Sequence, residues 1–234
     1  MLSHEQMQEA ARHGRALQTV YVYEAPVRAW HWITAAAMVV LIATGYFIGR
    51  PLLQLPGDDR DLFLMGYVRF AHFVAGYVLA VGLAGRLFWA CVGNAHARQL
   101  FTPPLLDGRW WSEVFFELRW YFFLEDKPKQ YVGHNPLAMC MMFFVFFLGS
   151  LFMIATGFAL YGEGAGAGHW ADLGFGWVLP ALGGSQMVHG LHRLIMWIQI
   201  CFIIIHIYAG IREDIMSRQS IVSTMLNGWR TFKD

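Results

Sequence analysis

A run of 18 residues near the C-terminal end of the chain, Leu194 to Ile211, carries no formal charge. Its only strongly polar side chains are Gln199 and His206, and its length is near the minimum for an α-helix that crosses a bilayer. His192 stands two residues before the run. An ionisable side chain at membrane depth is costly and normally has a partner or a function. These histidines therefore constrain the fold as strongly as the hydrophobicity does.

The spacing of the histidines suggests a function. His192 and His206 are 14 residues apart, so on one helix they lie within roughly 40° of each other and about 21 Å apart along the axis. His189 lies roughly 100° away from their line. One helix face then carries two imidazoles, one near each membrane boundary, as two metal centres stacked across a bilayer would require.

The composition agrees with a membrane protein. Hydrophobic residues make up 57% of the chain and charged residues 14%, against about 25% charged in soluble domains. A net charge of +1 gives no basic field for a nucleic-acid partner. The three cysteines form neither CxxC nor CxxCH, which excludes the usual covalent haem motif and an iron–sulfur ligand set. We expect the first apolar run, which has no obvious cleavage site, to serve as the insertion signal.

We expect an all-α membrane protein, with four transmembrane helices in an up-down bundle that forms a single membrane domain over residues 1–234. Between the second and third helices, apolar and charged residues alternate at helical spacing, which predicts an amphipathic helix in the interface. A glycine-rich loop, 162–184, should join the last two spans, and we find no internal repeat. The predicted spans are 29–49, 70–92, 137–161 and 190–211, the interfacial helix is about 110–126, and the tails are 1–28 and 212–234.

Four spans place both chain ends on one side of the membrane. The two tails and the 93–133 connection hold 12 Lys and Arg residues, whereas the other two loops and their flanks hold four. The excess of positive charge marks the cytoplasmic side. We therefore predict cytoplasmic N- and C-termini.

This orientation pairs the histidines by depth. His72, near the start of the second span, and His192 lie toward the outer side. His31, near the start of the first span, and His206 lie toward the cytoplasm. Two imidazoles from different helices are the axial ligands of a low-spin haem b, which leaves outer-sphere electron transfer as its chemistry. We interpret the four histidines as ligands of two haems.

Other interpretations of the histidines stay open. Each could be a polar packing residue, and His189 competes with His192 for the outer haem. A zinc site would need several ligands at one depth, and a proton relay would bring Asp or Glu into the spans, but the spans offer neither.

Small and basic residues near the outer pair suit a haem. Gly45 and Gly76 would let a flat macrocycle approach the backbone, although close helix packing explains such glycines equally well. Arg69 and Arg193 flank the outer pair and could bind haem propionates, or they could snorkel to the interface.

At the cytoplasmic mouth of the third span, His134 and Asn135 precede Pro136. Asn135 suits a helix cap and Pro136 a helix start. Both His134 and Asn135 also lie at the depth of a quinone head group near the inner haem. We expect His96 to be a solvent residue and leave the role of His169 open.

Several segments together resemble the b-type cytochrome subunit of membrane-bound uptake [NiFe]-hydrogenases, and more broadly the gamma subunit of respiratory formate dehydrogenase, a four-helix di-haem cytochrome. The resemblance covers nearly the whole chain from about Tyr21. The segments that carry it are EAPVRAWHW (24–32), ITAAAMVVLIATGYFIG (33–49), RFAHFVAG (69–76), GHNP (133–136), HGLHRL (189–194) and HIYAGIREDIMS (206–217).

The resemblance implies axial ligation by His31, His72, His192 and His206, the same pairs that depth suggests. It also implies a periplasmic hydrogenase as electron donor, whose small subunit has iron–sulfur clusters and a C-terminal anchor helix and whose large subunit splits hydrogen. The chain would thus serve a hydrogen:quinone oxidoreductase without a hydrogen-splitting site of its own. It would lie in the bacterial inner membrane, in a complex that we expect to be dimeric.

In this picture electrons pass from the outer haem to the inner haem, and quinone is reduced near His134, Asn135, Arg212 and Asp214 with cytoplasmic protons. Two alternatives remain. One is the equivalent subunit of a formate dehydrogenase or thiosulfate reductase complex. The other is a haem-free membrane anchor or transporter in which the histidines only pack.

Overall fold

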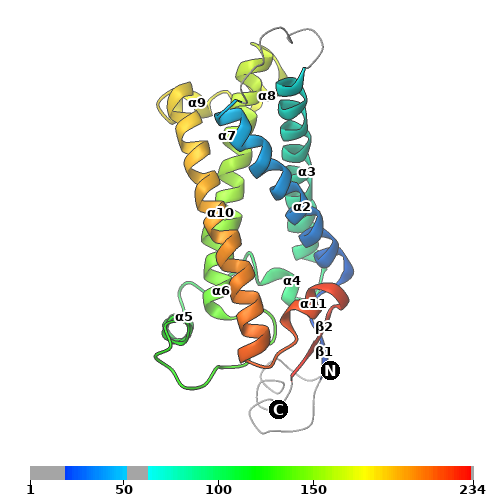
Figure 1. Ribbon diagram of the computed structural model, residues 1–234, viewed down its shortest axis with the longest axis vertical. Helices are drawn as coiled ribbons and strands as arrows, with labels where there is room; N and C mark the ends of the chain where they lie inside the picture. Colours follow the sequence, from blue (N-terminus) through cyan, green and yellow to red (C-terminus); the bar gives the residue numbers. More distant parts are fainter. Residues whose placement is uncertain (1–18, 52–62, 233–234) are drawn as a thin grey trace. The chain divides into compact units, whose positions relative to one another are not determined.

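The computed structural model describes residues 19–51 and 63–232. Within them, four helical stretches are long and apolar enough to cross a membrane (Figure 1). The fold class expected from the sequence, an all-α membrane protein, is confirmed. The four stretches are α2 (Ala25–Gly49), α3 (Leu64–Val92), the composite Pro136–Ala165, and α10 (Ser185–Met216).

The observed helices are longer than the predicted spans. Helix α10 continues to Met216, so Arg212 and Asp214, expected in a polar tail, belong to a helix. Charged residues are tolerated there because a helix can continue past the apolar layer into the polar interface. The third stretch is divided into α6 (Pro136–Met141), the π-helical turn η1 (Met142–Phe147) and α7 (Leu148–Ala165).

Shorter elements connect these helices. The predicted interfacial helix is present as α5 (Gly108–Tyr121), although it ends before residue 126. Two short helices, α8 (Trp170–Phe175) and α9 (Val178–Ala181), occupy a segment that we expected to be only a glycine-rich loop. The remaining elements are β1 (Thr19–Tyr21), α4 (Ala95–Arg98), α11 (Ile221–Asn227) and β2 (Trp229–Thr231).

The chain forms two compact units, and each is described by itself. Unit 1 comprises residues 1–29, 86–147 and 202–234, and unit 2 comprises residues 30–85 and 148–201. The part of the N-terminal tail before Thr19 lies outside the described residues.

Unit 1 joins the two ends of the described chain. Strand β1 pairs antiparallel with β2, with Thr19 opposite Thr231 (Figure 1). The first and last described segments therefore lie side by side, which is compatible with an even number of membrane crossings. The β2 strand was not expected, because we predicted only a tail over residues 212–234.

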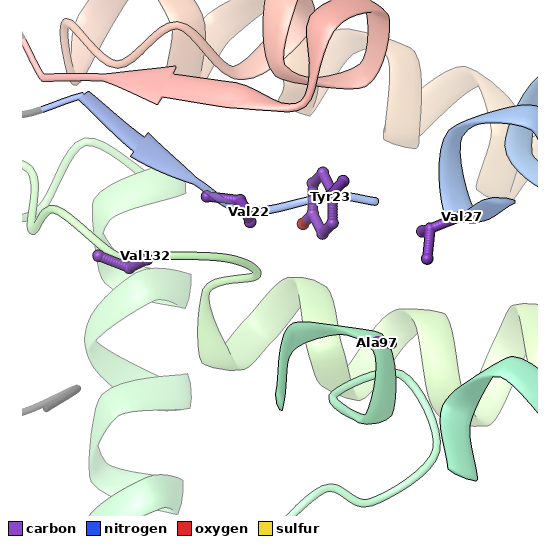
Figure 2. Close-up of a cluster of buried hydrophobic side chains, with 5 residues drawn as sticks. All are labelled: Val22, Tyr23, Val27, Ala97 and Val132. Atoms are coloured by element: carbon purple, nitrogen blue, oxygen red, sulfur yellow. The ribbon is translucent and has the colours of Figure 1, made fainter. Parts of the chain in front are cut away.

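The core of unit 1 is a small cluster beneath this strand pair (Figure 2). Glu24 ties the cluster to the end of α3, since its Oε2 accepts hydrogen bonds from the Trp89 indole and the Asn94 backbone, both at 2.9 Å. His96 is buried on α4, not solvated as we expected from its place in a polar connection. The buried apolar members are Val22, Tyr23, Val27, Ala97 and Val132.

Unit 2 is a bundle of four helical segments. Thr44, late in α2, contacts His72, early in α3, and Gly45 and Gly49 of α2 approach Met196 and Arg193 of α10 in reverse order. Contacts that pair rising with falling residue numbers indicate antiparallel neighbours. The up-down arrangement expected from the sequence is therefore present in unit 2.

Candidate cofactor site

A cavity of about 720 Å³ lies among the four helical segments of unit 2. Its wall is mainly aliphatic and aromatic, with a few polar groups. Both histidines of the predicted outer pair, His72 and His192, line it. So do four further residues that the sequence suggested for this site: Gly45, Arg69, Gly76 and Arg193.

Each histidine is fixed by a threonine on a neighbouring helix. Thr44 Oγ1 lies 2.8 Å from His72 Nδ1, and Thr156 Oγ1 lies 2.8 Å from His192 Nδ1. Both threonines also donate to their own helix backbone, Thr44 to Val40 O at 2.6 Å and Thr156 to Phe152 O at 2.7 Å.

The threonine contacts favour one tautomer of each imidazole. A threonine hydroxyl has one hydrogen to donate, and the shorter contact of each hydroxyl is to the backbone carbonyl. When the hydroxyl donates there, its oxygen accepts from the histidine, and Nδ1 carries the proton. In a neutral imidazole this leaves the Nε2 lone pair available to a metal, and a hydrogen bond at the other ring nitrogen is the usual way to orient a ligating histidine.

A glycine follows each threonine and adjoins the same imidazole. A Cβ added at Gly45 would lie 3.2 Å from His72 Cε1, and one at Gly157 would lie 3.5 Å from His192 Cε1. The motif Ile-Ala-Thr-Gly occurs twice, at 42–45 and 154–157. The first copy contacts His72 and the second contacts His192. We predicted no internal repeat, and this four-residue repeat was the signal that could have found both threonines.

The remaining wall suits a flat ring with acidic substituents. Gly76 faces the cavity, and nothing lies within 4 Å of where its Cβ would be. Arg69 and Arg193 lie at the same cavity and are exposed. Two buried polar side chains, Ser150 and Gln199, also line it.

The geometry separates His192 from its rival His189. His189 Nδ1 is 3.0 Å from Ser185 O, one turn earlier on its own helix. His189 also lines the cavity, but among the described residues it makes no threonine contact of the kind that His72 and His192 share. The pairing of like geometries favours His192 as the partner of His72.

The predicted inner pair falls on different units, so its pairing stays a prediction. In unit 2, His31 of α2 makes an edge contact with Trp32, with ring centroids 4.9 Å apart. In unit 1, His206 of α10 stacks on Phe202 with centroids 5.6 Å apart.

The four predicted quinone contacts all belong to unit 1 and fall into two groups. Asn135 caps α6 by accepting from Ala138 N, and its side chain also interacts with Tyr121, over whose ring the Arg212 guanidinium lies at 4.7 Å. His134 and Asp214 belong to the second group, described next.

The second group is centred on Arg230. Tyr23 Oη is 3.2 Å from His134 Nδ1 and interacts with Arg230. Burial, and next the Arg230 charge, lowers the pKa of His134 to about 3, so this imidazole stays neutral. Asp214 accepts from Val222 N at 2.9 Å and faces the same arginine.

The residues at the outer site fit a haem b. Two imidazoles with available Nε2 atoms line one apolar cavity, and glycines leave space beside them. The guanidinium groups of Arg69 and Arg193 could bind the haem carboxylates. Bis-histidine ligation with hydrogen-bonded Nδ1 atoms is the donor set that such a haem requires.

Comparison with known proteins supports haem b as the cofactor. Residues 22–228 match the family model described as prokaryotic cytochrome b561. A probable Ni/Fe-hydrogenase B-type cytochrome subunit of Cupriavidus necator is 58% identical over 96% of this chain and 92% of its own length. The protein of the same description from Rhizobium leguminosarum is 53% identical over 100% and 99%. The probable Ni/Fe-hydrogenase 1 B-type cytochrome subunit of Escherichia coli is 48% identical over 91% of each. This chain therefore belongs to the prokaryotic cytochrome b561 family.

Proposed function

We propose that this chain is the di-haem b subunit of a hydrogenase complex and passes electrons from a periplasmic [NiFe]-hydrogenase to membrane quinone. One observation carries the proposal: His72 and His192 direct matched, threonine-oriented imidazoles at one apolar cavity. The names of the similar proteins support the hydrogenase as partner.

At the outer site, the Nε2 atoms of His72 and His192 would hold the iron, and Arg69 and Arg193 would bind the propionates. Haem b supplies reversible one-electron transfer when bound. Because two protein imidazoles would hold the iron, no position would be left for oxygen or another small ligand. The residues would thus confine the site to electron transfer.

A second haem would be held by His31 and His206. His192 and His206 are 14 residues apart on α10, so two such sites would be about 21 Å apart along its axis. Electrons would enter at the outer site and leave at the inner one. Helix α10 would be the wall shared by both.

Quinone would be reduced in unit 1, near His134, Asn135, Arg212 and Asp214, with protons from the cytoplasm. Both chain ends would be cytoplasmic and the membrane would be the bacterial inner membrane. The small subunit, with its iron–sulfur clusters and anchor helix, and the large subunit would lie outside. A dimer of such complexes is the expected assembly, since twofold symmetry is the commonest.

A reduced-minus-oxidised spectrum and the haem-to-protein ratio of the purified complex test this proposal first. We expect a b-type α band and two haems per chain. His192→Ala should lose one haem and hydrogen-dependent quinone reduction. The matched control is His169→Ala, a histidine that caps α8 and should leave both haems in place.

Retention of both haems and full activity by His192→Ala would show that the ligand assignment is wrong. Absence of the α band would instead favour the haem-free anchor. Co-purification of a nickel protein would separate the hydrogenase partner from a formate dehydrogenase or thiosulfate reductase.

A further inference from the structure

Glu117 on the interfacial helix α5 is a buried carboxyl inside unit 1. Its side chain is 1% exposed, and its Oε1 has no hydrogen-bond partner among the described residues. A buried carboxylate without compensation is costly, so such a group is normally protonated. Neither the cofactor site nor the proposed quinone contacts use this residue.

The charged neighbours of Glu117 leave it without a cation of its own. On α10, Glu213 forms an ion pair with Arg212 at 2.9 Å, and the Trp120 indole donates a hydrogen bond to the same oxygen at 2.9 Å. On the connection after α5, Lys129 pairs with Glu113 at 2.8 Å. Both nearby cations are therefore already paired with other carboxylates.

These surroundings hold a proton on Glu117 near neutral pH. Burial first, and then the negative charges of Glu213 and Glu113, raise the pKa of Glu117 to about 7, against opposing effects of Tyr131 and Lys129. A carboxylic acid whose pKa is near the working pH is suited to give up and regain a proton in each cycle.

A path toward water begins at Tyr131. The Tyr131 hydroxyl donates to Glu113 Oε2 at 2.8 Å and also interacts with the Glu117 carboxyl. The side chain of Glu113 is 37% exposed, so water reaches it. One hydroxyl therefore stands between an exposed and a buried carboxyl.

A path toward the proposed quinone contacts begins at Tyr121. This residue lies one turn after Glu117 on the same helix face and is affected by the Glu117 charge. Tyr121 in turn contacts Asn135 and Arg212, two of the residues placed near the quinone.

We propose that Glu117 is the proton-delivery residue for quinone reduction, loaded from water through Glu113 and Tyr131 and unloaded through Tyr121. The inference rests on the proposed quinone-reducing function. Each quinone takes two electrons, which originate in hydrogen, and two protons. In each of two turns the Glu117 O–H bond breaks, the Tyr121 hydroxyl relays the proton, and an O–H bond forms on a quinone oxygen. The Glu117 carboxylate then regains a proton by way of Tyr131.

The test uses membrane vesicles that contain the complete complex. Glu117→Gln keeps the shape of the protonated side chain but cannot release a proton, and Tyr131→Phe removes the outward relay. Glu125→Gln is the matched control, because Glu125 is a carboxylate of the same connection that pairs with Arg119 in an exposed bridge. Three quantities are measured: hydrogen-dependent reduction of decyl-ubiquinone or menadione, haem reduction by hydrogen, and the infrared band of a protonated carboxyl.

We expect Glu117→Gln to slow quinone reduction roughly 100-fold, the usual scale for loss of a positioned acid, while haem reduction by hydrogen keeps its wild-type rate. Tyr131→Phe should slow quinone reduction in the same selective way. The protonated-carboxyl band should be present in the wild type at pH 6, decline as the pH rises through about 7, and be absent in Glu117→Gln. The wild-type quinone rate should decline over the same pH range.

Wild-type quinone rates and an unchanged pH profile in Glu117→Gln would overturn this inference and leave the proposed function standing. Wild-type vesicles that reduce haem with hydrogen but reduce no quinone would instead overturn the proposed function, and this inference with it.

Discussion

Replacing Thr156 by valine removes one hydroxyl from the outer site and nearly nothing else. The two side chains have almost the same shape, so packing is preserved. The lost contacts are the 2.8 Å hydrogen bond to His192 Nδ1 and the 2.7 Å bond that the hydroxyl donates to Phe152 O. Only the first of them orients the imidazole. Without it, the imidazole keeps a proton on Nδ1 with no acceptor, or it shifts that proton to Nε2 and loses the lone pair that would bind iron.

The expected magnitude follows from these alternatives. An unsatisfied buried donor costs about 1–3 kcal/mol, which corresponds to roughly 5- to 150-fold in an equilibrium constant. Removing the hydrogen-bond partner of a ligating histidine typically costs about 10- to 100-fold in metal affinity. We therefore expect haem to leave the outer site about 10- to 100-fold more readily in Thr156→Val.

Transfer of haem to excess apomyoglobin measures this change in the purified complex. Thr34→Val is the control, because Thr34 is also a buried threonine on a spanning helix of unit 2 but does not line the cavity. Thr156→Ser should restore wild-type transfer. Equal transfer rates for Thr156→Val and Thr34→Val would refute the assignment of Thr156 as the residue that orients His192.

Three further predictions concern other parts of the chain. The Cβ added by Gly76→Ala would meet no protein atom within 4 Å and would point into space that the haem needs. Haem retention should therefore fall, while the haem-free protein keeps its stability. The control Gly85→Ala, which also has open space, should retain haem normally. The folded-state pKa of Glu117, about 7, exceeds its ordinary value of 4.5, so its ionisation destabilises the fold as the pH rises between these values. The thermal midpoint of Glu117→Gln should therefore equal that of the wild type near pH 4.5 and exceed it above pH 7. The corresponding gain in the free energy of unfolding should be at most about 3 kcal/mol. Arg230 Nη1 donates to the carbonyls of Tyr131 and Gly133 at 3.1 and 2.7 Å, and Arg230→Leu leaves both without this partner. The free energy of unfolding in denaturant should fall by about 3–5 kcal/mol. Arg119→Leu, at an exposed ion pair, should lower it by less than about 1 kcal/mol.

Much of this architecture is readable from local patterns. Apolar runs of sufficient length identify the four spans, and the mixed charge of residues 110–126 identifies α5, because both signals depend only on neighbours in sequence. The helix ends are less readable, since Arg212 and Asp214 continue α10 where charge alone suggests a tail. His96 is buried because α4 packs into the core cluster of unit 1, to which its neighbour Ala97 belongs. This is a tertiary contact with no local signal.

At the cofactor site, too, some features can be predicted from neighbours in sequence and others depend on contacts between helices. Depth in the membrane and helical spacing predict that His72 and His192 share one site, because both quantities can be counted along the sequence. Both histidines do line one cavity. The partners of these histidines, Thr44 and Thr156, lie on other helices, 28 and 36 residues away, so spacing within one helix cannot reveal them. A search for similarity between spans finds them, through the repeated Ile-Ala-Thr-Gly.

The repeat also says something about the inner pair. Both copies of Ile-Ala-Thr-Gly serve the outer histidines, and neither lies near His31 or His206 in sequence. If the inner pair binds a haem, its imidazoles must be oriented by different groups, such as the aromatic contacts of His31 with Trp32 and of His206 with Phe202. Because hydrogen bonding at Nδ1 makes a histidine more basic and influences the potential of its metal, two haems held in such different ways should titrate at distinct potentials. Thr156→Val should then shift the potential of one haem and leave the other unchanged, and a potentiometric titration that found both shifted equally would contradict two separately built sites.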